Sequence, residues 1–153
     1  MRPAGLTGLA MTTLEASTVE IKSVFDLLSL STDADADSDA PAAVLVHCTQ
    51  GKDRTGLIVL LSLLLAGVDA EPISREYVLS EKELQNEPLE EKEEKMREIR
   101  ALGLDEEYTR CPGYFTERVT AFLEERFGGV RGYLDHINVE KGTIEKVKSR
   151  LLA

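Results

Sequence analysis

The stretch HCTQGKDRTG, residues 47–56, lies between two apolar runs, AAVLV at 42–46 and LIVLLSLLLAG at 57–67. The first run is short and continuously apolar, which is typical of a buried parallel strand, and we predict a strand over 42–47. The second run is apolar on all sides and predicts a central buried helix over 55–66, with Gly67 as its C-terminal stop. A polar loop therefore joins the end of a strand to the start of a buried helix.

The residues of this loop have the chemistry of a phosphate site with a nucleophile at its floor. Cys48 lies just before a helix N-terminus, whose free N–H groups and dipole favour a thiolate. Gly51 lets the backbone curl into a cradle of N–H groups, and Arg54 offers a planar fork for two phosphate oxygens. Thr55 can donate its hydroxyl to the sulfur, and His47 can hold the loop through hydrogen bonds.

The pattern His-Cys-x5-Arg-Thr-Gly resembles the signature of the cysteine-dependent protein tyrosine phosphatases. The fuller string is most similar to a bacterial and fungal tyrosine-phosphatase-like group with the signature HCxxGKDRT. REYVLSEKEL at 75–84 and CPGYFTERVTAFLEERFGGVRGYL at 111–134 also look like the C-terminal half of that group. The resemblance covers residues 5–153 and implies a parallel sheet wrapped by helices.

The resemblance also implies a role for each residue of the loop. Cys48 would be the nucleophile that forms a phosphocysteine, Arg54 would hold the phosphoryl oxygens, and Asp53 would be the general acid. Lys52 would add positive charge at the mouth, as in lipid-directed relatives. The implied substrates are phosphotyrosine, phosphoserine or phosphothreonine in proteins, or phosphoinositides, with no metal or organic cofactor. The predicted phosphate-binding residues are Thr49, Gln50, Gly51, Lys52, Asp53 and Arg54.

Several of these residues have a simpler interpretation. A lone Cys48 can be an inert buried thiol, and Asp53 can merely pair with Lys52 or Arg54. Lys52 can be a solvated charge. A Walker phosphate loop is rejected because Val46 stands where its first Gly is needed and Asp53 follows Lys52. Three interpretations follow: an active phosphatase, a phosphate-binding but catalytically poor module, or a helical interaction protein.

Composition limits the partners of the chain. It has 153 residues, 42% of them hydrophobic, two cysteines and a formal net charge of −10. That size suits a single domain over 1–153. The acidity argues against nucleic acid as a partner, and no apolar stretch is long enough for a transmembrane segment. Two cysteines form no disulfide framework, so we expect a reducing, cytoplasmic setting.

Helical patterns dominate the rest of the chain. Apolar spacing predicts helices from about residue 17 to 30, from Pro72 onward, from Pro112 to 127, and near 144–151. Over 87–100 the stretch is dominated by charge, and oppositely charged pairs at i,i+4 spacing predict a helix. Residues 31–41, STDADADSDAP, predict a flexible acidic loop, and the charged run at 81–98 a solvated face or a lid. With the resemblance, these patterns imply an α/β, tyrosine-phosphatase-like fold class that is mostly helical, with one strand and an incomplete parallel sheet. The front half of the family fold would lie before residue 1, and an oligomer could supply its strands from another chain.

Overall fold

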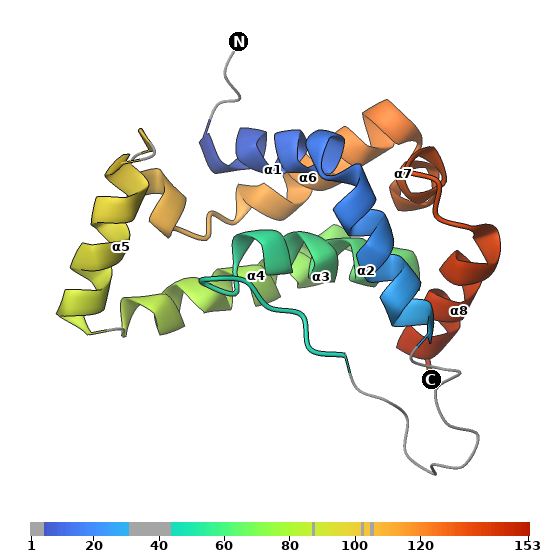
Figure 1. Ribbon diagram of the computed structural model, residues 1–153, viewed down its shortest axis with the longest axis horizontal. Helices are drawn as coiled ribbons and strands as arrows, with labels where there is room; N and C mark the ends of the chain where they lie inside the picture. Colours follow the sequence, from blue (N-terminus) through green and yellow to red (C-terminus); the bar gives the residue numbers. More distant parts are fainter. Residues whose placement is uncertain (1–4, 31–43, 87, 102, 105) are drawn as a thin grey trace.

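A computed structural model describes residues 5–30, 44–86, 88–101, 103–104 and 106–153 (Figure 1). The regular secondary structure in these residues is helical. The predicted helices are all present, with ends that differ by a few residues. Two further helices, near the N-terminus and after the Gly128-Gly129 pair, were not predicted. In chain order the elements are α1 (Gly5–Ala16), α2 (Thr18–Leu30), α3 (Asp53–Ala66), α4 (Ala70–Gln85), α5 (Leu89–Ala101), the 3-10 helix η1 (Glu106–Thr109), α6 (Tyr114–Phe127), α7 (Val130–His136) and α8 (Lys141–Leu151).

The core is built around α3, the helix that follows the polar loop. Leu60, Leu61 and Leu65 are almost completely buried, and α3 packs against α1, α4, α7 and α8. Gly67 ends the helix at φ 90°, and its N–H bonds back to the last turn. This left-handed residue is the glycine stop that the sequence predicts. The start of α3 is therefore anchored by a buried helix body.

The N-terminal helix α1 is tied to the C-terminal part of the chain. The Tyr133 hydroxyl of α7 donates a buried hydrogen bond of 2.8 Å to the Leu14 carbonyl. Leu6, Ala10 and Leu14, spaced four residues apart, are the buried hydrophobic side chains of α1. This spacing places the three side chains on one face of the helix, and α1 packs against α3 and α6.

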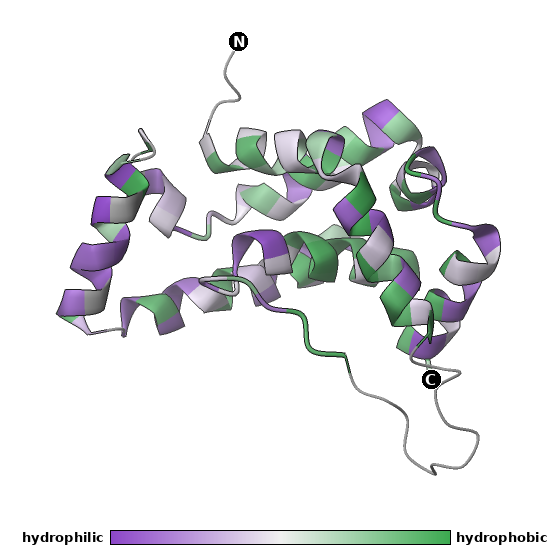
Figure 2. Cartoon of the chain, in the orientation of Figure 1, coloured by the Kyte–Doolittle hydropathy of each residue, from purple (hydrophilic) through white to green (hydrophobic). Residues whose placement is uncertain are grey.

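The predicted strand over 42–47 is not confirmed. Residues 44–48 have no regular structure, and no strand occurs in the part of the chain that the structure describes. Val44 is 40% exposed and Leu45 is 85% exposed, and Val46 of this apolar run is partly buried against the core. Figure 2 shows it running along the outside of the helices. A strand needs a neighbouring strand for its backbone hydrogen bonds, and none is present among the described residues. Residues 42 and 43 and the predicted acidic loop at 31–41 lie outside the described residues.

None of the helices in the described ranges is both long enough and apolar enough to cross a membrane.

Candidate active site

The polar loop curls around Cys48 at the N-terminal end of α3. Gly51 has a φ of +70°, in the left-handed region that glycine enters at little cost. Burial alone raises the pKa of Cys48, but hydrogen bonds from the hydroxyl and N–H of Thr55 and from the N–H groups of Gln50 and Gly51 outweigh it. Together they lower this pKa from 9.0 to about 7. The loop therefore stabilises a thiolate near neutral pH.

The Thr55 hydroxyl has a specific relation to the thiol. Its oxygen is buried and has no hydrogen-bond partner of ordinary geometry among the described residues. It nevertheless lies close enough to the Cys48 sulfur to lower the pKa of the thiol. A buried donor without a partner costs free energy, and an ionised sulfur beside it is the acceptor that would satisfy it. The structure thus places the Thr55 hydroxyl beside the thiol, and its supporting role stays a prediction.

Arg54 crosses the mouth of the loop. Its side chain is exposed, and Nη2 donates a hydrogen bond of 3.1 Å to the Thr49 hydroxyl. Arg54, Thr49, Gln50, Asp53 and Cys48 all line one cavity of about 370 Å³. The guanidinium fork and the thiol thus share a single space, as a phosphate site with a nucleophile requires.

Lys52 lies beneath the loop and not at its mouth. Its side chain is fully buried, with 0% exposure. Its Nζ donates hydrogen bonds to Asp53 Oδ1 at 2.7 Å and to the Arg110 carbonyl at 3.3 Å. A buried ammonium needs such partners, because its desolvation is otherwise very costly. Lys52 is therefore neither a solvated charge nor a contact at the mouth, and it ties the start of α3 to the segment before α6.

Asp53 has two neighbours of different kinds. Its carboxylate is 33% exposed, lines the cavity beside Cys48 and Arg54, and also pairs with the buried Lys52. The sequence left an ion pair and a general acid as alternatives for Asp53. The structure contains the ion pair and places the carboxylate in the cavity as well, so the acid role stays a prediction.

His47, by contrast, has an exposed side chain with no hydrogen bond to the described part of the chain. Its predicted function of holding the loop stays a prediction.

The floor of the loop rests on an aromatic and thiol cluster that the sequence did not predict. The rings of Tyr77 and Phe115 stack at 4.7 Å between centroids and 15° between planes. A Cβ on Gly56 would lie 3.4 Å from the Tyr77 ring, so the glycine after Arg54-Thr55 allows this ring to approach α3. Cys111 is 1% exposed, and burial raises its pKa to about 11, although the nearby Lys52 opposes the increase. Cys111 is thus a mostly protonated, unreactive thiol near neutral pH.

The remaining cavity wall comes from segments far from the loop in sequence. Leu104 and Ile99 come from α5 and the residues after it, Tyr108 from η1, and Phe115 from α6. Leu6 and Ala10 come from α1, opposite. No local sequence pattern marks these residues as neighbours of Cys48. The only sequence signal was the amphipathic spacing that placed Phe115 on the buried face of its helix.

Comparison with known proteins identifies the family. Residues 4–153 match the model of the tyrosine phosphatase family. A tyrosine-protein phosphatase of Nostoc commune is 35% identical over 140 residues, which cover 86% of this chain and 44% of the relative. The triple specificity protein phosphatase PtpB of Mycobacterium tuberculosis is 27% identical over 125 residues, covering 71% of this chain and 44% of the relative. The chain therefore belongs to the tyrosine phosphatase family, and it spans less than half the length of these two relatives.

Proposed function

We propose that the protein is a cysteine-dependent phosphatase that hydrolyses phosphomonoesters through a phosphocysteine intermediate. The observation that carries the proposal is the Cys48 thiol, whose pKa is lowered to about 7 by donors of the loop that also presents Arg54 to the same cavity. A thiolate populated at neutral pH is the form that attacks phosphorus. The family membership and the fit of HCTQGKDRTG to the HCxxGKDRT group support the assignment.

The proposed reaction has two steps. The Cys48 sulfur attacks the phosphorus, the bond to the ester oxygen breaks, and Asp53 gives that oxygen its proton. Water then attacks the phosphocysteine with Asp53 as base, which releases inorganic phosphate and restores the thiolate. Arg54 and the loop N–H groups stabilise the charge on the phosphoryl oxygens in both steps.

The test is hydrolysis of p-nitrophenyl phosphate by the 153-residue chain. We expect turnover in the parent chain and loss to the background rate in Cys48→Ser, because the nucleophile is gone. Asp53→Asn should lower kcat about 10²- to 10⁴-fold, the usual contribution of a general acid. Turnover that survives Cys48→Ser would contradict the mechanism, and an unchanged rate in Asp53→Asn would contradict the acid assignment alone.

A second candidate function is phosphate binding without efficient catalysis. The observation that favours it is the apolar run before Cys48, in which Leu45 is 85% exposed and no strand among the described residues supports the loop on that side. In this case the chain would bind inorganic phosphate in an Arg54-dependent manner, measured by calorimetry, and show no turnover. Phosphate binding that is unaffected by Arg54→Gln would contradict this candidate as well.

A further inference from the structure

A second cavity, which we call the basic groove, lies beside the active site between α4, α5 and the end of η1. Its volume is about 560 Å³. Figure 1 shows α5 standing across the end of α4 at one side of the molecule. The basic groove is lined by Gln50, Glu81, Leu84, Gln85, Lys92, Lys95, Met96, Arg100, Thr109 and Arg110.

The basic groove is continuous with the active site. Gln50 and Lys95 line both this groove and the cavity that contains Cys48. Gln50 belongs to the loop itself and supplies one of the N–H groups that lower the pKa of Cys48. A substrate with its phosphoryl group on Cys48 can therefore extend directly into the basic groove.

The charge of the basic groove is opposite to that of the protein as a whole. Four cationic side chains line it in a chain whose formal net charge is −10. They come from separate segments, with Lys92, Lys95 and Arg100 on α5 and Arg110 after η1. Although α5 also carries glutamates, the described lining of the groove holds these four cations and one acidic residue, Glu81. This balance marks a place that favours anionic groups.

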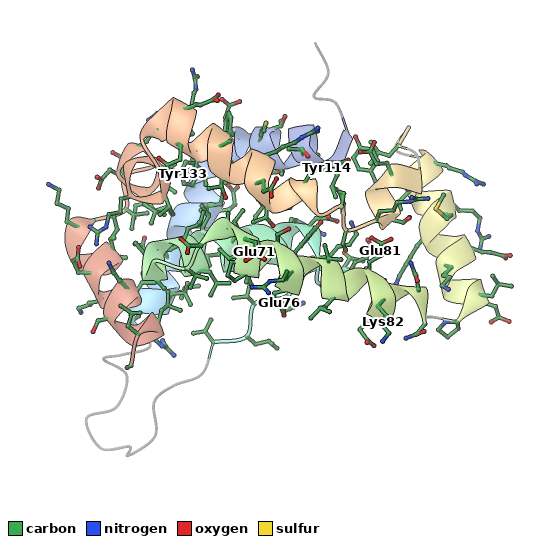
Figure 3. The ribbon with its side chains drawn as sticks, turned by 180° about the vertical axis from the view of Figure 1, so that it is seen from behind. Glu71, Glu76, Glu81, Lys82, Tyr114 and Tyr133 are labelled. Atoms are coloured by element: carbon green, nitrogen blue, oxygen red, sulfur yellow. The ribbon has the colours of Figure 1, made fainter. Side chains whose placement is uncertain are left out.

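Three of these cations, Lys92, Arg100 and Arg110, have donors available to a ligand. Among the described side chains, no carboxylate pairs with the guanidinium of Arg100 or that of Arg110. Lys92 Nζ donates to the Gln85 carbonyl, which leaves further N–H donors on the same ammonium. The one acidic residue among the described lining residues is Glu81, whose Oε2 accepts a 3.0 Å hydrogen bond from the Cys111 N–H. Figure 3 shows Glu81 on α4, on the side facing the segment that leads into α6.

The spacing of the cations favours an extended ligand over a single small anion. Lys92, Met96 and Arg100 follow one another at four-residue intervals along one face of α5. Lys92 and Arg100 are thus about 12 Å apart along the helix axis, at 1.5 Å per residue. An extended peptide covers that distance in about four residues at 3.3 Å each. A row of cations of this length matches a row of acidic side chains.

We propose that the basic groove binds acidic residues that flank the phosphorylated residue of a protein substrate, so that the enzyme selects acidic phosphopeptides. This proposal rests on the proposed phosphatase function, since it specifies the substrate class of the same active site. Lys92 and Arg100 are the specificity-determining residues that contact the flanking carboxylates, while Cys48 and Arg54 hold the phosphoryl group.

The test measures peptide binding separately from turnover. Fluorescein-labelled phosphotyrosyl peptides, with acidic flanks on either side or with matched glutamine flanks, are titrated into the Cys48→Ser chain by anisotropy. Of the peptides with acidic residues before or after the phosphotyrosine, we expect the tighter binder to have about tenfold higher affinity than the glutamine-flanked peptide. This preference should weaken as salt is added. In the Lys92→Gln/Arg100→Gln variant this preference should disappear, while binding of the neutral peptide is unchanged.

Arg97→Gln is the matched control, because Arg97 lies on the same helix without lining the basic groove. It should keep the full preference, and circular dichroism should show equal helix content in all variants. Equal binding of acidic and neutral peptides would overturn the inference, and so would a preference that survives loss of Lys92 and Arg100. Tighter binding of inositol 1,4-bisphosphate than of any peptide, with the same dependence on Lys92 and Arg100, would also overturn it in favour of a small bisphosphate.

Failure of the proposed function has a different result. It would appear as absent p-nitrophenyl phosphate turnover in the parent chain, whatever the peptide affinities. A chain that turns over p-nitrophenyl phosphate yet binds both peptides equally would be a phosphatase without this substrate preference.

Discussion

The two apolar runs on either side of the phosphate loop have similar composition and opposite environments. After the loop, residues 57–67 lie mostly in α3, where Leu61 is completely buried. Before the loop, residues 44–46 have no regular structure, and Leu45 is 85% exposed. A helix satisfies its own backbone hydrogen bonds, whereas a strand depends on a neighbouring strand. The loop is therefore anchored from its C-terminal side, through α3 and the buried Lys52.

Leucine truncation on the two sides of the loop should produce the largest contrast. Leu61→Ala should lower the free energy of unfolding by about 3 kcal/mol, because it leaves a cavity in the packed core. Leu45→Ala should change it by less than about 0.5 kcal/mol, as for most exposed positions. Urea denaturation followed by circular dichroism measures both. A loss of unfolding free energy of comparable size in Leu45→Ala would show that Leu45 is buried in solution, and would contradict the contrast between the two apolar runs.

The buried lysine should produce the next largest effect. Lys52→Met keeps most of the side-chain volume but removes the hydrogen bonds to Asp53 and to the Arg110 carbonyl. We expect a loss of about 2 kcal/mol in unfolding free energy, below the usual range for breaking a buried pair because Asp53 is partly exposed. The exposed Lys82→Met on α4 is the matched control and should be neutral. If the two variants were equally stable, Lys52 would not be the anchor described here.

The left-handed glycine of the loop should have a smaller effect on stability. Gly51→Ala places a Cβ in open space but at a φ of +70°, which costs about 1 kcal/mol. Since the Gly51 N–H is one of the donors to Cys48, the pKa of the thiol should also rise. Gly142→Ala in α8, likewise in open space but at an ordinary helical φ, should be neutral or slightly stabilising. Equal effects of the two substitutions would show that the loop conformation is not required.

The smallest expected change concerns the Thr55 hydroxyl. Thr55→Val keeps the shape of the side chain and removes the donor that lowers the pKa of Cys48. The pKa of the thiol should therefore rise above about 7, which lowers the thiolate fraction and the alkylation rate at pH 6 to 7. Thr49→Val, in a residue that bonds to Arg54 and not to the sulfur, is the matched control. If the pH dependence of Cys48 alkylation were unchanged in Thr55→Val, the hydroxyl would not contribute to the low pKa of the thiol.

Much of the helical fold could be predicted because amphipathic patterns are local. The helix α1 was missed since its sequence, GLTGLAMTTLEA, has few charges to define a polar face. The seven-residue α7 is too short for a periodic pattern to be recognised. The strand prediction relied on composition alone, and composition does not reveal whether a partner strand is present.

The loop could be predicted because its donors and nucleophile are contiguous in sequence. The burial of Lys52 could not, because lysine is almost never fully buried and one of its two partners, the Arg110 carbonyl, lies 58 residues away. The cavity wall from α1, η1 and α6, and the basic groove beside it, also depend on tertiary packing. Three charged residues that line the basic groove, Glu81, Lys92 and Lys95, come from the charged run at 81–98. Composition had predicted only a solvated face or a lid for that run.

The most direct test of the central claim is the pH dependence of Cys48 alkylation by iodoacetamide in the full chain, read residue by residue by mass spectrometry. Only the thiolate reacts, so the rate should rise with pH and reach half its maximum near pH 7. Cys111, whose pKa is raised to about 11, should remain unmodified over the same range and serves as an internal control. A midpoint near the ordinary value of 8.5 to 9 for Cys48 would mean that α3 and Lys52 alone do not hold the loop in its anion-binding form.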